Sequence, residues 1–429
     1  MDLTLEKLLS RVGGNNSNSV IIPLFICFIG GALRIIVAVF VTGDRFIWPD
    51  EINDYYPAAL RLFEGKGWGS KTNIMPFFPY VLSIYFHLGD GDILWTRIIL
   101  ACLNSSMMPC VYFLTRHIFG KTSALCAMFI VACYPILIFS SVLILPETFF
   151  TLLVVLGILS FSLACTKPSF LWLSALLFGL ANFTISILSP FIILAFFIVM
   201  YILRHESLIK RVTKTVLFML IFYSTVCLWG IRNYFVLGEF LTTKSNVGKV
   251  LYMHNNEFSS GFNRKENFLQ FTNNILPRIE EELKDENDLA KNRIFTAKST
   301  DFIRSHPLQF LVLCLERFLN LWRFYPEETI SESSFTASPF KVMSIVTYGP
   351  ILLLALVGLI RARKMFRSHL VIWGYCISLV FIFTLIRSSM RARLPLEPFL
   401  ALYAGAGMTY VWRYFQAHFL KTKGNQVQL

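Results

Sequence analysis

Long apolar runs dominate this sequence and constrain its fold more than any other feature. The chain is 55% hydrophobic and 15% charged, whereas soluble domains carry roughly 25% charged residues. A helix needs about 20 apolar residues to cross the hydrocarbon core of a membrane. We therefore expect an all-α polytopic membrane protein with about ten to twelve transmembrane helices. The ten candidate spans lie near residues 20–41, 93–115, 121–141, 147–165, 169–184, 187–204, 213–231, 341–360, 368–386 and 396–414.

The net charge of +13 is better explained by membrane orientation than by a nucleic-acid partner, because Lys and Arg lie mostly at the ends of apolar runs. Basic residues in short loops mark the cytoplasmic side. If all such loops share one side, the runs 75–89 and 308–325 are interfacial or re-entrant helices and not spans. Both termini are then cytoplasmic, and the segments 42–92 and 232–340 lie outside. The basic loops are 116–121, 204–214 and 361–367.

These two outer segments suggest a division of the chain into three parts. Residues 1–231 form an N-terminal transmembrane module that includes the outer loop 42–92. Residues 232–340 form a large outer loop with interfacial helices, in which the charged stretch from Arg278 to Arg304 predicts a solvated helix. Residues 341–429 supply the C-terminal transmembrane helices.

Cysteine and histidine positions argue against a metal site. All nine cysteines lie inside apolar runs without a C-x-x-C pair, so we expect neither disulfides nor a thiolate site. The seven histidines show no i, i+4 pairing, and none forms a metal motif. Paired carboxylates could hold a divalent metal ion, but no cofactor follows with certainty.

A cluster of acids follows directly after the first apolar run. Asp50, Glu51 and Asp54 occupy five residues beginning next to Pro49. Acids beside a bilayer cost desolvation energy and repel one another, so such a cluster indicates a functional site. The alternative is an ordinary helix start, in which Pro49 takes the first helical position and the acids face the helix dipole.

Arginines near the end of the chain form a second cluster. Arg387, Arg391 and Arg393 fall on the predicted outer side, against the positive-inside tendency. Guanidinium groups bind phosphate through paired charge-assisted hydrogen bonds, so the cluster indicates an anionic ligand. Contact with lipid headgroups, or pairing with Glu397, is the alternative.

Two further arginines, Arg34 and Arg97, lie inside or at the edge of apolar runs. Each costs about 2.5 to 3.5 kcal/mol at the centre of a membrane unless it is paired. We expect Asp50, Glu51 or a bound phosphate to be the partner.

Several short motifs occur in an order that resembles one known family. They are P-D-E-I-N-D-Y-Y at 49–56, M-P-F-F-P-Y at 75–80, L-P-E-T-F-F at 145–150, L-W-G-I-R-N-Y at 228–234 and R-A-R-L-P-L-E-P at 391–398. This series resembles the GT-C glycosyltransferases that take sugars from polyprenyl phosphates. More narrowly, it resembles the bacterial relatives of protein O-mannosyltransferases and of the lipid A aminoarabinose transferases.

The resemblance implies a GT-C-type helical bundle with interfacial helices in two outer loops, and an inverting reaction that needs no nucleotide sugar. Asp50 would be the catalytic base and Glu51 its supporting neighbour. The donor phosphate would be bound by Arg391 and Arg393, and we add Arg97 from its position. The expected substrate contacts are Asp54, Tyr55, Glu147, Arg232, Asn233, Asn255 and Asn256.

We therefore expect a membrane glycosyltransferase on the outer face of a bacterial inner membrane. Its partners would be a polyprenyl-phosphate sugar donor, membrane lipids, and a glycan, lipid or protein acceptor, in cell-envelope glycan, lipopolysaccharide or protein glycosylation. The alternatives are a transporter or flippase, which predicts charges near mid-span in corresponding halves, and a polymerase of lipid-linked glycans. The prediction requires Asp50 to meet Arg391 and Arg393 in one pocket.

Overall fold

The computed structural model describes residues 18–69, 71–164, 166–259, 264–324, 338–387 and 389–426. These residues form helices without any β-strand, so the predicted all-α class is confirmed. In the first part of the chain the elements are α2 (Asn18–Ile36), the π-helical turns η1 (Val37–Thr42) and η2 (Glu51–Tyr55), α3 (Tyr56–Phe63), α4 (Phe77–Gly89), α5 (Ile93–Ser105), α6 (Met107–Phe119), α7 (Lys121–Cys133), α8 (Pro135–Ser140), α9 (Pro146–Leu163), α10 (Ser169–Thr184), α11 (Ser189–Ile202) and α12 (Leu208–Leu237).

The second part of the chain continues from the large loop to the C-terminal helices. Its elements are α13 (Val247–His254), η3 (Glu257–Ser259), α14 (Arg264–Gln270), η4 (Phe271–Ile275), α15 (Leu276–Glu282), α16 (Asp288–Ser305), α17 (Pro307–Leu321), α18 (Ser338–Ala362), η6 (Arg363–Met365), α19 (Phe366–Leu385), α20 (Met390–Arg393), η7 (Leu394–Leu396) and α21 (Glu397–Gln426).

Six helical stretches in the described part of the chain are long and apolar enough to cross a membrane, which identifies an integral membrane protein. They are Val20–Thr42, Ile93–Phe119, Pro146–Leu163, Leu208–Leu237, Val342–Ala362 and Phe366–Leu385. Other predicted spans are shorter: α7 has 13 residues, α10 has 16 and α11 has 14. The helices α4 and α17, with 13 and 15 residues, are also shorter than a full crossing needs. The total number of spans and the three-part division stay predictions.

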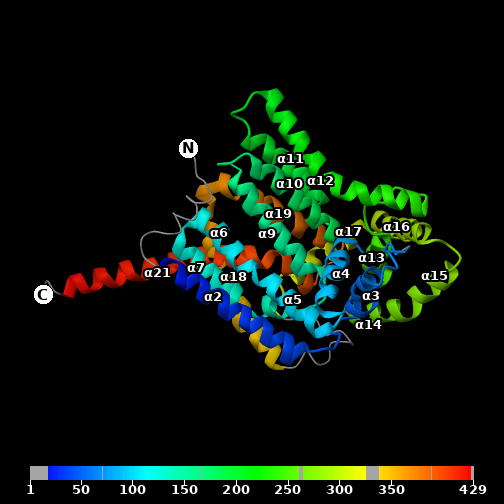
Figure 1. Cartoon of the computed structure of the whole chain (residues 1–429), viewed down its shortest axis with the longest axis horizontal. Helices are drawn as coiled ribbons and strands as arrows, with labels where there is room; N and C mark the ends of the chain where they lie inside the picture. The colour runs from blue at the N-terminus through cyan, green and yellow to red at the C-terminus, as the bar shows by residue number, and fades with distance from the viewer. Residues whose placement is uncertain are drawn as a thin grey trace.

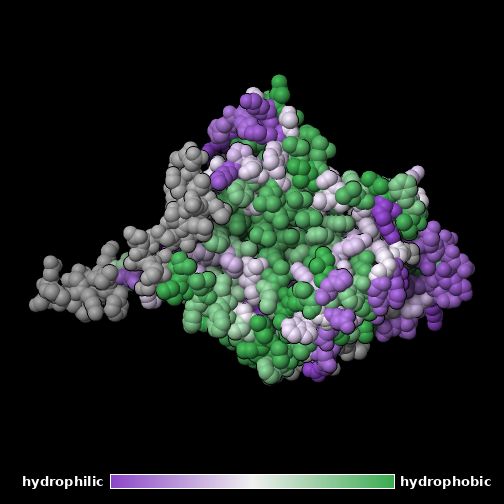
Figure 2. Space-filling model, viewed as in Figure 1, coloured by the Kyte–Doolittle hydropathy of each residue, from purple (hydrophilic) through white to green (hydrophobic). Residues whose placement is uncertain are grey.

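Loop helices gather at one end of the molecule. Figure 1 shows α13, α15 and α16 at the end opposite the C-terminus, beside α3 and α4, while the apolar helices form the rest. Hydrophilic residues cover that end in Figure 2. The predicted solvated helix is two helices, because the chain turns after α15 and Asn287 begins α16 by accepting a hydrogen bond from the Ala290 amide at 2.8 Å. Side chains of Phe271, Leu276 and Phe295 form a small core under this layer.

The predicted span 121–141 is interrupted, and Arg34 stabilises the break. Pro135 has no N–H and disfavours a helical conformation at the residue before it, so Tyr134 is extended and α7 ends. The guanidinium of Arg34 donates hydrogen bonds to the carbonyl oxygens of Val131 at 2.9 Å and Gly30 at 2.8 Å. Inside a membrane, backbone groups freed by a helix break need partners within the protein, and Arg34 supplies one.

The C-terminal helices pack with their backbones in contact. A Cβ atom at Gly407 would collide with the backbone carbonyl of Leu354, and one at Gly358 would collide with that of Tyr403. Small residues allow helices in membranes to approach this closely. The packing of α18 against α21 therefore fixes the start of α21, which lies next to the R-A-R motif.

Candidate active site

The acid cluster forms a short helix with two different faces. Pro49 is its first helical residue, and the chain then widens into the π-helical turn η2. Asp50 and Asp54 lie four residues apart, share one face, and keep 46% and 23% of their side chains exposed. Glu51 and Tyr55 share the other face and are buried. The sequence D-E-I-N-D-Y thus points its first two acids in different directions.

Arg391 joins the exposed acid to a third segment of the chain. Its Nη1 donates to Asp50 Oδ2 at 2.7 Å, and its Nε donates to Glu147 Oε1 at 2.6 Å. Glu147 lies in the first turn of α9, where the helix dipole favours a negative charge. Ser389 caps α20 and thereby fixes Arg391 in place. Of the predicted meeting of Asp50 with Arg391 and Arg393, the structure has the contact with Arg391, whereas Arg393 pairs with Glu397.

The charges around Arg391 keep it protonated. Burial would lower the pKa of its guanidinium, but attraction by Glu147 and Asp50, and the hydrogen bonds to them, raise the pKa overall. Its remaining terminal nitrogen, Nη2, forms no hydrogen bond with any described residue and is not buried. Asp50 Oδ1 is likewise without a partner among the described residues. One donor and one acceptor therefore stay open at this site.

Two more cations lie within electrostatic reach of Asp50 and Glu147. They are Lys244, which is half-buried, and Arg387, whose side chain is exposed. Neither forms an ion pair with a residue that the structure describes. Desolvation lowers the pKa of Lys244, and the positive charge of Arg391 lowers it further, although the nearby carboxylates act in the opposite direction. The site thus contains a group of cations suited to a multiply charged anion.

A contact between the two large loops positions Lys244. The Ser245 amide donates to the Thr72 carbonyl at 2.9 Å, and the two hydroxyl groups are 2.7 Å apart. Lys71, next to Thr72, pairs with Asp54 Oδ1 at 3.0 Å. Sequence reasoning missed Lys244 because nothing in its spacing distinguishes it from the other lysines of the loop. Its role depends on this long-range contact.

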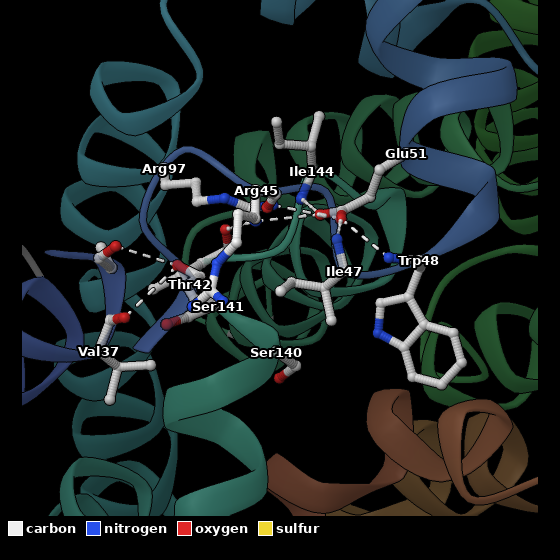
Figure 3. A network of polar contacts seen from close by, with 12 residues as sticks. Val37, Thr42, Arg45, Ile47, Trp48, Glu51, Arg97, Ser140, Ser141 and Ile144 are labelled. Carbon is white, nitrogen blue, oxygen red and sulfur yellow. Dashed lines mark hydrogen bonds and ion pairs between the residues drawn. The ribbon is translucent and has the colours of Figure 1, made fainter. Parts of the chain in front are cut away.

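Glu51 anchors the backbone behind the exposed site (Figure 3). Its Oε2 accepts hydrogen bonds from the amides of Ile47 at 2.6 Å and Trp48 at 3.1 Å, and its Oε1 accepts one from the Ile144 amide at 2.7 Å. The charge is balanced by Arg97, whose Nη1 and Nη2 lie 3.0 and 3.2 Å from the two carboxylate oxygens. The predicted pairing of Arg97 with Glu51 is confirmed.

Both side chains of this pair are fully buried. Arg97 also donates to the carbonyls of Val142 at 2.8 Å and Arg45 at 2.6 Å. Neither group is open to a ligand, so the predicted role of Arg97 on the donor phosphate does not fit, and any support that Glu51 gives to Asp50 acts through the backbone. Instead the pair holds together the loops that carry Asp50 and Glu147.

Arg393 also lies inside the protein. Its Nε pairs with Glu397 at 2.6 Å, and its Nη1 donates to the carbonyls of Arg323 and Leu321 at the end of α17. The guanidinium carbon lies 3.7 Å from the ring centre of Tyr348. The predicted phosphate contact of Arg393 does not fit this burial, and the alternative, pairing with Glu397, is what the structure has.

Four residues that were predicted to contact the substrate make hydrogen bonds within the outer loops instead. Arg232 lies over the Trp229 ring and donates to the Gly69 carbonyl, and Asn233 donates to Leu241. Asn255 is buried and accepts from Arg317 at 2.9 Å. Asn256 stabilises the turn after α13, because its side-chain oxygen accepts a hydrogen bond from the Phe258 amide at 2.8 Å. None of these four contacts Asp50 or Arg391 in the structure.

Buried arginines therefore share one structural role. Arg34, Arg97, Arg317 and Arg393 are fully buried and donate to backbone carbonyls where helices end or loops turn. The expectation that an acid or a phosphate pairs with Arg34 is wrong, because its partners are carbonyls. Arg391 differs from these four, since it donates to carboxylates alone and to no backbone carbonyl of the described residues, and 26% of its side chain is exposed.

The site offers no cluster of metal ligands in the part of the chain that the structure describes. No three side chains among His, Cys, Asp and Glu lie close enough there to hold a metal ion. Arg391 lies between Asp50 and Glu147 and pairs with one oxygen of each acid. Among the described residues, positive charge at this site comes from Arg391, Lys244 and Arg387.

Comparison with known proteins supports the predicted family. A family model described as dolichyl-phosphate-mannose-protein mannosyltransferase matches residues 72–229. The oligosaccharyltransferase of Archaeoglobus fulgidus in its apo form superposes with a TM-score of 0.53 at 15% identity, covering 94% of this chain and 52% of that protein. A structure of the same enzyme, AglB, in complex with an inhibitory peptide and a dolichol-phosphate gives the same values.

ArnT from Cupriavidus metallidurans bound to undecaprenyl phosphate is also similar, with a TM-score of 0.40, 14% identity, and coverage of 91% of this chain and 78% of that one. No curated protein matches this chain. The chain spans about half the length of the archaeal oligosaccharyltransferase. The fold shared with that enzyme and the family match over 72–229 confirm the resemblance to GT-C glycosyltransferases.

Proposed function

We propose that this protein transfers a sugar from a polyprenyl-phosphate donor to an acceptor hydroxyl or similar group. The observation that carries the proposal is the contact of Arg391 with Asp50 and Glu147 beside Lys244 and Arg387. It combines a carboxylate that can accept a proton with cations that can stabilise a leaving phosphate. The dolichol-phosphate in the archaeal structure favours a lipid-linked donor.

Asp50 is the proposed catalytic base. Arg391 holds its Oδ2 at 2.7 Å and so orients the carboxylate, leaving Oδ1 to take the proton of the acceptor hydroxyl. As that proton leaves, the acceptor oxygen forms its bond to the anomeric carbon of the sugar. The bond between that carbon and the phosphate oxygen breaks, and the configuration of the carbon inverts in a single displacement.

The leaving polyprenyl phosphate departs with its electron pair and needs positive charge more than a proton. Arg391 can bind it through Nη2 while keeping both of its carboxylate partners. Lys244 and Arg387 add two further positive charges from different segments. Preorganised charges of this kind stabilise developing negative charge without reorganisation during the reaction.

Trp48 is the proposed contact for the sugar ring. Its backbone is fixed by Glu51, and its indole points away from that carboxylate (Figure 3). The ring centre lies 5.8 Å from the Arg391 guanidinium carbon, and its Nε1 is buried without a hydrogen-bond partner in the described structure. Indole offers a broad apolar face, which suits the C–H face of a sugar.

We place the site on the outer face of a bacterial inner membrane. The support is the basic composition of the loops 204–214 and 361–367, which marks them as cytoplasmic. In this orientation the acceptor is a glycan, a lipid or a protein of the cell envelope.

The experiment that tests the proposal uses the purified full chain in detergent with a panel of polyprenyl-phosphate sugars and a mixture of envelope acceptors. Release of free polyprenyl phosphate, followed by chromatography, is the readout. We expect release with at least one donor in the wild-type protein and none in Asp50→Asn. Asp44→Asn is the matched control, because Asp44 is an exposed acid of the same loop. Release that is equal in all three proteins would contradict the proposal.

A further inference from the structure

A groove lined only by apolar and aromatic side chains lies between α11 and α12, in the part of the chain that the site does not use. Its volume is about 240 Å³. Ile193 and Phe197, on successive turns of α11, line it and are 60% and 62% exposed. Met219 and Tyr223 line it from α12, also on successive turns. The groove therefore opens sideways, toward the lipid that surrounds a membrane helix.

The two helix faces that line this groove both lead to cationic groups. One turn beyond Phe197 on α11 is Tyr201, about 6 Å along the helix axis. Arg204 and Arg367, the latter from the start of α19, lie within electrostatic reach of the Tyr201 hydroxyl. The Arg204 guanidinium also lies over the Tyr201 ring, 4.6 Å from its centre. Two guanidinium groups thus lie near one tyrosine at the end of the groove.

The face of α12 that lines the groove also leads to a cationic group. Two turns before Met219 is Arg211, about 12 Å along the axis, and its Nε is buried without a hydrogen-bond partner in the described structure. The one acid of the turn between the helices, Glu206, is already paired with Lys214 at 2.6 Å. In Figure 1 this turn lies at the top of the view, and in Figure 2 hydrophilic residues gather there above a hydrophobic flank.

We infer that this groove binds an anionic phospholipid of the membrane. An acyl chain fits the apolar side chains between α11 and α12, and the headgroup phosphate fits the guanidinium groups of Arg204 and Arg367. Basic groups between membrane helices at the bilayer surface recognise anionic headgroups. A zwitterionic lipid offers the same chains, but its cationic headgroup is repelled by the same arginines. The charge at the end of the groove therefore selects the lipid, and this site is separate from the sugar-transfer site.

The test measures the unfolding temperature of the purified full chain in detergent while phosphatidylglycerol or phosphatidylcholine with identical acyl chains is added. We expect phosphatidylglycerol to raise the unfolding temperature with a half-saturating concentration about tenfold or more below that of phosphatidylcholine. The double variant R204Q/R367Q should lose this difference, whereas R204K/R367K, which keeps the charge, should retain part of it. The matched control R293Q/R304Q removes two charges from α16 and should keep the full difference.

Three results would overturn the inference. The first is equal half-saturation of the wild-type protein by both lipids, and the second is an unchanged preference in R204Q/R367Q. The third is displacement of phosphatidylglycerol from the groove by a polyprenyl phosphate, which would assign the groove to the carrier lipid. If R204Q/R367Q does not fold, the inference is tested by native mass spectrometry of the wild-type protein from mixed micelles, which measures the lipid that stays bound. Retention of phosphatidylglycerol over phosphatidylcholine supports the site, and equal retention contradicts it.

Discussion

Asp50 and Arg391 lie 341 positions apart in the chain and form an ion pair of 2.7 Å at a partly exposed site. The same guanidinium holds Glu147 at 2.6 Å, so one side chain joins the first outer loop, the start of α9 and the segment before α21. A pair that only stabilised the fold would contribute little at this exposure, because exposed ion pairs typically contribute about 0 to 1 kcal/mol. Under the proposed function, the pair also orients the carboxylate that accepts the proton.

Replacing Asp50 by Asn should abolish sugar transfer while leaving the protein folded. The amide keeps a hydrogen bond to Arg391 but cannot accept the acceptor's proton, and loss of a general base costs roughly 10²- to 10⁴-fold in rate. The measurement is the initial rate of polyprenyl-phosphate release, with the unfolding temperature recorded in parallel. Near wild-type turnover in a folded Asp50→Asn protein would rule out this residue as the base.

The orientation of Asp50 and Glu51 toward different sides of their short helix could be predicted from their spacing alone. Consecutive helical residues point about 100° apart, so Asp50 and Glu51 could not both face one ligand, and the i, i+4 partners Asp54 and Tyr55 follow them. The motif R-A-R obeys the same rule: residues two positions apart on a helix point about 200° apart. One arginine of the motif therefore turns toward the site and Arg393 turns inward.

Other features could not be predicted from the sequence. Lys244 reaches the site through the contact between Thr72 and Ser245, which are 173 positions apart. The carbonyl partners of Arg34 exist because α7 ends before Pro135, a break that a count of apolar residues does not reveal. Long-range backbone partners of this kind carry no local pattern in the chain.

Lys244 should give donor binding a characteristic pH dependence. Its pKa is lowered by desolvation and by Arg391, so the charge that attracts phosphate is present below that pKa and is lost as the pH rises through it. The KM for the donor should therefore increase toward alkaline pH, and earlier than an ordinary lysine would allow. Lys244→Arg should remove this increase, because arginine stays charged.

The KM of Lys244→Gln should be high at every pH, which separates loss of charge from loss of structure. Lys249→Gln is the control, since Lys249 lies in the same loop and pairs with Glu280. An alkaline increase that persists unchanged in Lys244→Arg would assign the titration to another group.

Breaking the Glu51–Arg97 pair should destabilise the protein more than any exposed pair does. Removing one partner leaves a buried charge uncompensated and backbone groups unpaired, which costs about 3 to 5 kcal/mol. Arg97→Met and Glu51→Gln should each lower the free energy of unfolding, measured by chemical denaturation in detergent. In the control Lys284→Gln, which breaks an exposed pair with Glu281, the change should stay under about 1 kcal/mol. Equal effects of the three substitutions would contradict the structural role of the buried pair.

Substitutions of Arg391 and Arg393 should change different quantities. The Arg391 variant should change catalysis and donor binding, and the Arg393 variant should change stability. Arg391→Gln removes a charge that faces the donor phosphate, so kcat should fall by about 10²- to 10³-fold, with a higher donor KM and a small change in unfolding temperature. Arg393→Gln breaks a fully buried pair with Glu397, so it should lower the unfolding temperature while the folded fraction keeps the wild-type donor KM. Both constants are measured below the unfolding temperature of the weaker variant, with Arg45→Gln as the exposed control. A raised donor KM in Arg393→Gln with an unchanged unfolding temperature would reverse the two assignments.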